Sequence, residues 1–188
     1  RGHHVWVSTP EDPASSRMGE TIYHFASREL PGTFIRGWEQ EALRLSKKGK
    51  SAWSLENEIL QGYAITIGVA AVLVAILGWA VLPFIIAHHF VGWYGLTQAN
   101  YVEHYGLLRQ KRENGRYEPV QPRHSWNTNH IFSNLITFHL QRHSDHHANP
   151  TRRYQTLRTF DEAPQLPSGY GTMIGLAYCP PLWRKVMD

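Results

Sequence analysis

Histidine is concentrated in one short segment of this chain, which has 188 residues and 12 histidines in all. Four of them, His139, His143, His146 and His147, lie within nine residues. On a helix of 3.6 residues per turn these side chains fall within an arc of about 100° and face one point. Neutral imidazole is a good ligand for iron, zinc, copper and nickel. The segment therefore predicts metal ligands at His143, His146 and His147, and zinc fits this spacing as well as iron.

Three more histidines could complete such a site. His3 and His4 lie near the start of the sequence, and His104 directly follows a long apolar stretch. The pair His88 and His89 lies about 22 Å along a helix from His104, so we expect it to lie outside the metal site.

The elements that must position these histidines include a long stretch without charge. No Asp, Glu, Lys or Arg occurs in the 44 positions from 59 to 102, and Gly78 and Pro83 interrupt this stretch. As a helix it spans about 66 Å, close to two crossings of a hydrocarbon core about 30 Å thick. We therefore predict an all-α integral membrane protein, in which a two-span transmembrane hairpin (Ile59–Leu77 and Phe84–Val102) is joined to cytoplasmic helical segments rich in histidine.

The charges around this hairpin predict its orientation. Because cytoplasmic flanks carry the excess of Lys and Arg, both flanks are expected on the cytoplasmic side, which puts all the candidate ligands on one side of the membrane. The resulting segments are residues 1–58, 59–103 and 104–188. The basic residues that flank the spans are Arg44, Lys47, Lys48, Lys50, Arg109, Lys111, Arg112 and Arg116.

Local patterns add further expectations. Thr9–Asp12 is typical of a helix start, with Thr9 as the N-cap. An amphipathic helix is predicted from Gly32 to Lys48. Residues 127–129 offer caps for a helix in the apolar run Ile131–Leu140. A single cysteine excludes an internal disulfide framework, and because the sequence opens without Met we expect a fragment.

Three motifs together carry a resemblance to a known family. They are Arg-Gly-His-His (1–4) with the downstream Thr-Pro-Glu-Asp-Pro (9–13), Asn-Tyr-Val-Glu-His-Tyr-Gly (100–106) and Leu-Gln-Arg-His-Ser-Asp-His-His-Ala (140–148). The chain resembles the membrane-bound alkane 1-monooxygenases through essentially its whole length, including residues 150–154 and 164–170.

This resemblance implies a non-haem di-iron enzyme of six spanning helices in the bacterial inner (plasma) membrane. Such an enzyme binds two iron (Fe) ions without haem or flavin, and it uses O2 to hydroxylate the terminal methyl group of linear medium-chain alkanes to 1-alkanols. The family's ligands are all histidines, and those present here are His3, His4, His104, His143, His146 and His147. The first histidine box and the leading histidine of the second do not occur in this sequence, so we expect this chain to be inactive by itself.

Residues around the ligands have candidate roles. Glu20, Glu103 and Asp145 could accept hydrogen bonds from the ligating imidazoles, or they could be solvated charges. At helical spacing before His104, three apolar residues could line a substrate channel, although the pattern favours ordinary helix packing over this role. They are Leu96, Ala99 and Val102.

Electrons must come from another protein, because the sequence has no dinucleotide-binding glycine motif and no cysteine cluster. The resemblance implies rubredoxin, supplied by an NADH-dependent rubredoxin reductase. Basic side chains after the second span could dock such an acidic partner, or they could simply contact the lipid bilayer. We expect no nucleic-acid binding, because no nucleic-acid motif accompanies the basic residues. The candidate docking residues are Arg109, Lys111, Arg112, Arg116, Arg152, Arg153 and Arg158.

Two other functions remain open. A membrane fatty-acid desaturase or hydroxylase has related histidine boxes, and differs in its motifs and in its substrate. A metal transporter would place its ligands within the spans, whereas the densest histidine cluster here lies outside them.

Overall fold

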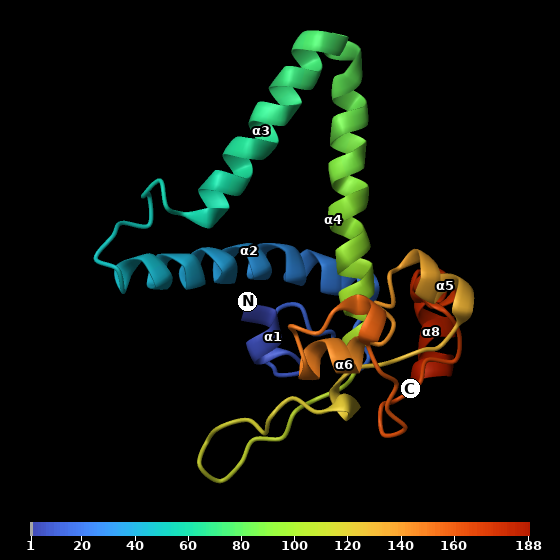
Figure 1. The fold of residues 1–188 in the computed structure, drawn as a ribbon. Helices are drawn as coiled ribbons and strands as arrows, with labels where there is room; N and C mark the ends of the chain where they lie inside the picture. Colours follow the sequence, from blue (N-terminus) through green and yellow to red (C-terminus); the bar gives the residue numbers. More distant parts are fainter. Residues whose placement is uncertain (1) are drawn as a thin grey trace. The chain divides into compact units, whose positions relative to one another are not determined.

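The structure, a computed structural model, describes residues 2–188, and these residues form helices and no β-strand. The prediction of an all-α protein is confirmed over this range (Figure 1). Short 3₁₀ turns at Trp79–Val81, Pro122–His124 and Tyr154–Thr156 join some of the helices. The α-helices are α1 (Gly2–Trp6), α2 (Ile22–Ser46), α3 (Glu58–Leu77), α4 (Leu82–His104), α5 (Ile131–Ile136), α6 (His143–Ala148), α7 (Tyr170–Ala177) and α8 (Pro180–Met187).

Contacts divide the chain into two compact units. One unit combines Arg1–Gly32 with Thr97–Asp188, and the other is Thr33–Leu96. The unit boundaries fall inside α2 and α4, because both helices contribute residues to both units. The boundaries expected from the sequence, at 58/59 and 103/104, follow the loss and return of charge instead.

The unit Thr33–Leu96 contains most of the two apolar helices. The Asn57 side chain caps α3 by accepting hydrogen bonds from the backbone N–H groups of Ile59 (2.9 Å) and Leu60 (3.1 Å). At its other end, Gly78 has a φ of 78°, a conformation that glycine adopts without strain. Pro83 lies in the first turn of α4, where no backbone N–H is needed.

Both apolar helices have the length and composition of membrane spans. The candidate spans are Glu58–Leu77 and Trp79–His104, which confirms a pair of such helices. The first begins one residue before the predicted Ile59–Leu77, and the second begins five residues before and ends two residues after the predicted Phe84–Val102. None of the α3 residues, all of which the structure describes, is buried. Apolar surface on this scale is unfavourable in water and is typical of helices that contact lipid.

Helix α2 differs from its prediction at its start. The sequence predicts a helix over Gly32–Lys48, whereas α2 begins ten residues earlier, at Ile22. The helix contains Pro31 in its interior. Burial explains the extension, because Ile22 and Phe25 in the first turn are fully buried in the hydrophobic core of the unit Arg1–Gly32 and Thr97–Asp188.

That core holds the end of α4 in place. Tyr101, Val102 and Tyr105 pack against α7 and α8, and Trp183 of α8 lies with its ring 5.1 Å from the rings of both tyrosines. The Tyr101 hydroxyl donates to the backbone carbonyl of Glu20 at 2.7 Å. The last turn of α4, which ends at His104, is therefore fixed by packing and by hydrogen bonding.

Candidate metal centre

His104 is the last residue of α4 and is fully buried. The backbone on either side of it is fixed by Trp126, whose backbone N–H donates to the Glu103 carbonyl and whose ring N–H donates to the Tyr105 carbonyl, both at 2.9 Å. Gly106 has a φ of 71°, and a Cβ there would lie 2.6 Å from the Met18 side chain. Glycine at this position of the motif therefore turns the chain sharply after the histidine.

Helix α6 carries His143, His146 and His147 at the spacing expected for one helical face. Asn127 fixes its first turn from a distance, because its side chain accepts from the Ser144 N–H (3.0 Å) and donates to the Ser144 hydroxyl (2.6 Å). The Asp145 carboxylate accepts from the Arg158 backbone N–H at 2.8 Å and anchors the other side of the turn.

Two sequence expectations for this region are wrong. The Asn127 side chain accepts from a backbone N–H in the first turn of α6, and it does not cap the helix that begins at Ile131. The residue at the N-cap of α5 is His130, whose side chain makes no capping hydrogen bond within the described structure. His139 lies outside α6, which begins at His143, and its φ of 60° marks a turn. Its ring therefore does not continue the helical arc that the spacing predicts.

Helix α1 carries His3 and His4. The His3 Nδ1–H donates to the Asp12 carboxylate at 2.7 Å, which leaves Nε2 of His3 without a hydrogen-bond partner among the described residues. The predicted helix start at Thr9–Asp12 is wrong, because these residues form turns. The Thr9 hydroxyl donates back to the Trp6 carbonyl, and the Asp12 carboxylate is committed to His3 and to the Ser15 hydroxyl (2.7 Å).

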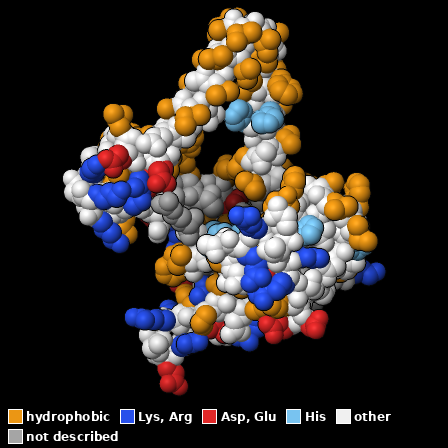
Figure 2. Space-filling model, in the orientation of Figure 1, with side chains coloured by type: hydrophobic (Ala, Val, Ile, Leu, Met, Phe, Trp, Pro, Cys, Tyr) orange, Lys and Arg blue, Asp and Glu red, His pale blue; other side chains and the backbone are white. Residues whose placement is uncertain are grey.

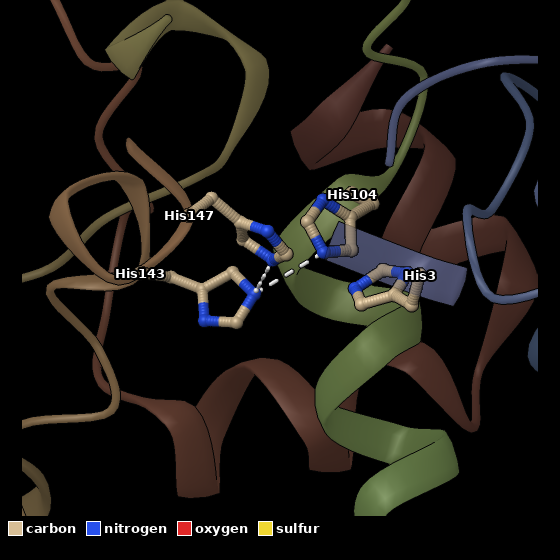
Figure 3. A group of neighbouring side chains, drawn as sticks. All are labelled: His3, His104, His143 and His147. Carbon is tan, nitrogen blue, oxygen red and sulfur yellow. Dashed lines mark hydrogen bonds between the residues drawn. The ribbon is translucent and has the colours of Figure 1, made fainter. Parts of the chain in front are cut away.

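The rings of all six predicted histidine ligands form one continuous cluster. The ligand nitrogens of four of them, His3, His104, His143 and His147, lie within 4.8 Å of one another. In Figure 3, Nε2 of His143 faces Nε2 of His147 at 2.8 Å and Nε2 of His104 at 3.2 Å. His4 and His146 adjoin this group with their ring centroids 4.8 Å apart.

Burial lowers the pKa of several of these imidazoles. Desolvation, reinforced by the neighbouring histidines, holds the pKa of His143 and of His147 well below the ordinary value of 6.5. Burial and the nearby His146 and His3 lower the pKa of His4 to about 4. Burial would raise the pKa of Asp12, but the hydrogen bonds from His3 and Ser15 keep it below its ordinary value. Burial thus favours the neutral, metal-binding form of His4, His143, His146 and His147.

This donor set fits a metal ion. Two neutral imidazoles cannot form a hydrogen bond between nitrogens that both lack a proton, and here such buried nitrogens face one another within 3.2 Å. A metal cation placed among them would accept a lone pair from several of these nitrogens at once. The His3–Asp12 pair matches the common arrangement in which a carboxylate orients a ligating imidazole. All-nitrogen ligation suits iron, zinc or copper better than magnesium or calcium.

Of the three carboxylates considered from the sequence, only Glu103 contacts the cluster through a described hydrogen bond or ion pair. Its Oε2 lies 3.1 Å from Nε2 of His143, and its Oε1 accepts from the Tyr170 hydroxyl at 2.6 Å. Asp145 instead binds Arg158, Arg152 and Asn149, and Glu20 binds Arg28 and His24. Asp12 and Tyr170 were missed in the sequence, where only their place in the Thr-Pro-Glu-Asp-Pro and Pro-Ser-Gly-Tyr segments could have marked them.

The candidate channel residues differ in exposure. Ala99 and Val102 are buried in the unit that holds the histidines, whereas Leu96 is 65% exposed. Val102 lies two residues before His104 and packs in the hydrophobic core.

The candidate docking residues divide into anchored and exposed side chains. Arg109 is anchored, because it donates to the backbone carbonyls of Glu118 (2.6 and 2.8 Å) and Val5 (2.9 Å). Arg152 pairs with Asp145 at 3.4 Å and is half-buried. Arg158 also pairs with Asp145 but remains largely exposed. The other exposed basic side chains of the set are Lys111, Arg112, Arg116 and Arg153.

Comparison with known proteins agrees with this geometry. A model of the fatty acid desaturase family matches residues 1–177. The whole chain is 58% identical to part of an alkane 1-monooxygenase from Ectopseudomonas oleovorans, covering 47% of that protein, and 56% identical to part of alkane 1-monooxygenase 1 from Alcanivorax borkumensis, covering 46%. It is 31% identical over 182 residues to the hydroxylase component of xylene/toluene monooxygenase from Pseudomonas putida. The chain spans about half the length of the curated relatives it matches.

Proposed function

The chain belongs to the fatty acid desaturase family, and from this premise we propose that it acts as an alkane 1-monooxygenase, which uses O2 to hydroxylate the terminal methyl group of linear medium-chain alkanes. The convergence of His3, His104, His143 and His147 on one buried point carries the proposal, because it supplies a metal site to go with the relatives' activity. The identity to two alkane 1-monooxygenases exceeds that to the xylene/toluene enzyme, which favours an alkane.

The six clustered histidines would hold iron. His3, His104, His143 and His147 form one group of nitrogens, and the adjoining His4 and His146 provide donors toward a second ion. Since the relatives are about twice as long as this chain, the activity is proposed for the full-length gene product, in which further histidines complete a di-iron site.

The residues around the cluster orient its side chains and bury several of its imidazoles away from water. Asp12 holds the tautomer of His3 in which Nε2 is free to ligate, and Tyr170 holds the Glu103 carboxylate beside His143. Bound iron would supply the oxidising power that a terminal C–H bond requires. An alkane offers no polar group, so its binding rests on apolar side chains, and the candidates are Leu96, Ala99 and Val102 on the helix that ends at His104.

Electrons would arrive from rubredoxin, reduced by an NADH-dependent reductase. The exposed side chains of Lys111, Arg112, Arg116, Arg153 and Arg158 could steer an acidic protein to this face. The charge distribution around the two spans supports an inner-membrane location, with the histidine cluster on the cytoplasmic side.

The proposal is tested with the full-length gene product in membranes, supplied with rubredoxin, its reductase, NADH, n-octane and ¹⁸O₂. We expect 1-octanol that carries ¹⁸O, and no product without rubredoxin. Iron-loaded protein that makes no octanol would contradict the proposal.

A second candidate is a desaturase or hydroxylase of fatty acyl chains, which the family match itself favours. The same preparation is therefore supplied with a saturated fatty acyl substrate. A new double bond or hydroxyl group there, without octanol from octane, would assign the chain to this second function.

A further inference from the structure

Helix α5 and the turn after it expose a group of large apolar side chains. Ile131, Phe132, Leu135, Ile136 and Phe138 are each between 62% and 78% exposed, and we name these five residues the apolar ridge. Figure 2 shows apolar side chains gathered on the surface where Figure 1 places α5. A contiguous apolar surface of this kind usually marks contact with another molecule or with lipid.

The opposite face of α5 is polar and firmly bonded. The Ser133 hydroxyl donates to the Gln141 side chain at 2.8 Å, and the Asn134 side chain donates to the Thr128 carbonyl at 3.2 Å. Both side chains are buried. The helix thus points its polar side chains inward and its apolar ones outward, the reverse of a helix that packs on a water-soluble core. These buried hydrogen bonds fix the orientation of α5, so the apolar ridge faces outward in a defined position.

The sequence around the ridge has the composition of a bilayer interface. No Asp, Glu, Lys or Arg occurs in residues 124–141, and Arg123 and Arg142 bound this uncharged run. Phe138 makes an edge-to-face contact with the half-exposed Tyr154, with their ring centroids 5.4 Å apart. Aromatic rings that flank an aliphatic patch, with arginines beyond, are typical of segments that lie in the interface of a membrane.

The ridge belongs to the same unit as the end of a candidate span. The last residues of that span, Thr97–His104, lie in this unit, and Figure 1 draws α5 at the level of these turns of α4. Hydrogen bonds connect the two helices, since Gln141 accepts from both Ser133 and the Tyr170 N–H, and the Tyr170 hydroxyl donates to Glu103. A unit that contains the end of a spanning helix must meet the bilayer surface.

We propose that the apolar ridge of α5 inserts into the lipid headgroup and acyl boundary beside the end of α4, as an interfacial anchor that does not span. The inference rests on the membrane location given under the proposed function. A helix of six residues is too short to cross, and the five exposed apolar side chains provide the apolar area on which interfacial binding depends. The anchor would fix the histidine-bearing unit against the membrane from which an apolar substrate arrives.

The test uses the full-length gene product in vesicles of phosphatidylcholine and phosphatidylglycerol. Native accessible cysteines, Cys179 among them, are first replaced by serine. A single spin label is then attached to Phe132→Cys, with Ile67→Cys on α3 as the lipid control and Glu113→Cys as the water control; all three positions are exposed. Power-saturation electron paramagnetic resonance measures the collision of each label with O2, which concentrates in lipid, and with a water-soluble nickel chelate.

We expect the ratio of O2 to nickel accessibility at Phe132 to match that at Ile67 and to exceed that at Glu113 several-fold. A ratio equal to that at Glu113 overturns the inference, because the ridge then faces water. Low accessibility to both reagents also overturns it, because a second copy or another part of the gene product then covers the ridge. A water-like ratio at Ile67 would overturn the membrane location as well, whereas octanol formation and iron content are measured separately on the same variants.

Discussion

The two units of this chain place polar and apolar side chains in opposite ways. In the unit of Arg1–Gly32 and Thr97–Asp188, the buried side chains include His104, His143, His147, Glu103 and Asp145. In the unit Thr33–Leu96, helix α3 is almost wholly apolar and yet buries none of its residues. Buried polar groups are costly unless they are bonded or bind a ligand, and exposed apolar helices are costly in water. The contrast indicates that the buried polar side chains of the first unit bind a ligand and that the exposed apolar helix of the second contacts lipid.

The histidines repeat the contrast. His88 and His89 also have neighbouring rings, with centroids 5.6 Å apart, but both are exposed on α4, and Nδ1 of His89 lies 2.7 Å from the Ile85 carbonyl of its own helix. The rings of the metal centre come from three helices distant in sequence, and Asp12 fixes one of them from outside. In this chain, neighbouring histidines therefore form a candidate site where separate helices converge and a carboxylate orients one of the rings.

The largest effect is expected from exchanging one histidine in each unit for asparagine. His143→Asn in the full-length gene product removes a nitrogen at the centre of the cluster, and should reduce bound iron and abolish octanol formation. His88→Asn should leave both unchanged. Iron content by plasma emission spectrometry and octanol by gas chromatography check the pair; equal losses in the two variants would erase the contrast.

A smaller effect is expected from the residue that orients His3. Asp12→Asn keeps the shape of the side chain and removes its charge, so iron affinity should fall about 10- to 100-fold, the usual cost of losing such a partner. The matched control is Glu11→Gln, because Glu11 is the exposed neighbour of Asp12 and accepts a hydrogen bond from the Tyr117 hydroxyl at 2.6 Å. Iron-binding titrations of both variants are compared. Unaltered affinity in Asp12→Asn would show that His3 does not depend on this bond.

The buried bond between Tyr170 and Glu103 should contribute to stability. Tyr170→Phe leaves the packing in place and removes one donor from a buried carboxylate, at a cost of about 1–3 kcal/mol in the free energy of unfolding. Tyr154→Phe, which alters a half-exposed hydroxyl, serves as the control and should cost much less. Thermal unfolding of both proteins in detergent measures the difference, and equal midpoints would place little weight on this bond.

The buried histidines should also make the metal-free protein sensitive to acid. Burial and neighbouring imidazoles hold the pKa of His143 and His147 below 6.5 and that of His4 at about 4. As the pH falls below about 6.5, the unfolded chain takes up protons before the folded one does, so stability is lost toward pH 4. Urea unfolding across this range should show the loss, and His143→Asn should reduce its slope. Stability that rises as the pH falls over the same range would contradict the shifts.

The smallest effect is expected at the surface proposed for rubredoxin. Arg112→Glu reverses an exposed charge, and should raise the KM for rubredoxin several-fold without changing iron content. Lys185→Glu makes the same charge change on α8, outside the proposed docking set, and is the control. The difference between the two should shrink in high salt, because exposed charges are screened. Equal KM values at low salt would remove Arg112 from the docking surface.

The sequence predicted those features that depend on local pattern. A stretch of 44 uncharged positions located both candidate spans, and the spacing of His143, His146 and His147 placed them on one face of a helix. The roles of Asp12, Asn127 and Tyr170 depend on contacts across 9, 17 and 67 positions, which no local periodicity encodes. Thr9 and Asp12 have the local pattern of a helix start, but their side chains form hydrogen bonds with Trp6 and His3 of α1, and this pattern does not encode those contacts.

The most direct test of the metal centre is X-ray absorption at the iron K-edge on the purified full-length gene product, with His143→Asn measured alongside. The account predicts a nitrogen-rich first shell with the outer-shell scattering of imidazole rings, and a loss of part of that scattering in the variant. A shell dominated by carboxylate oxygen without imidazole scattering, or a spectrum unchanged in the variant, would contradict the claim that these histidines bind the iron.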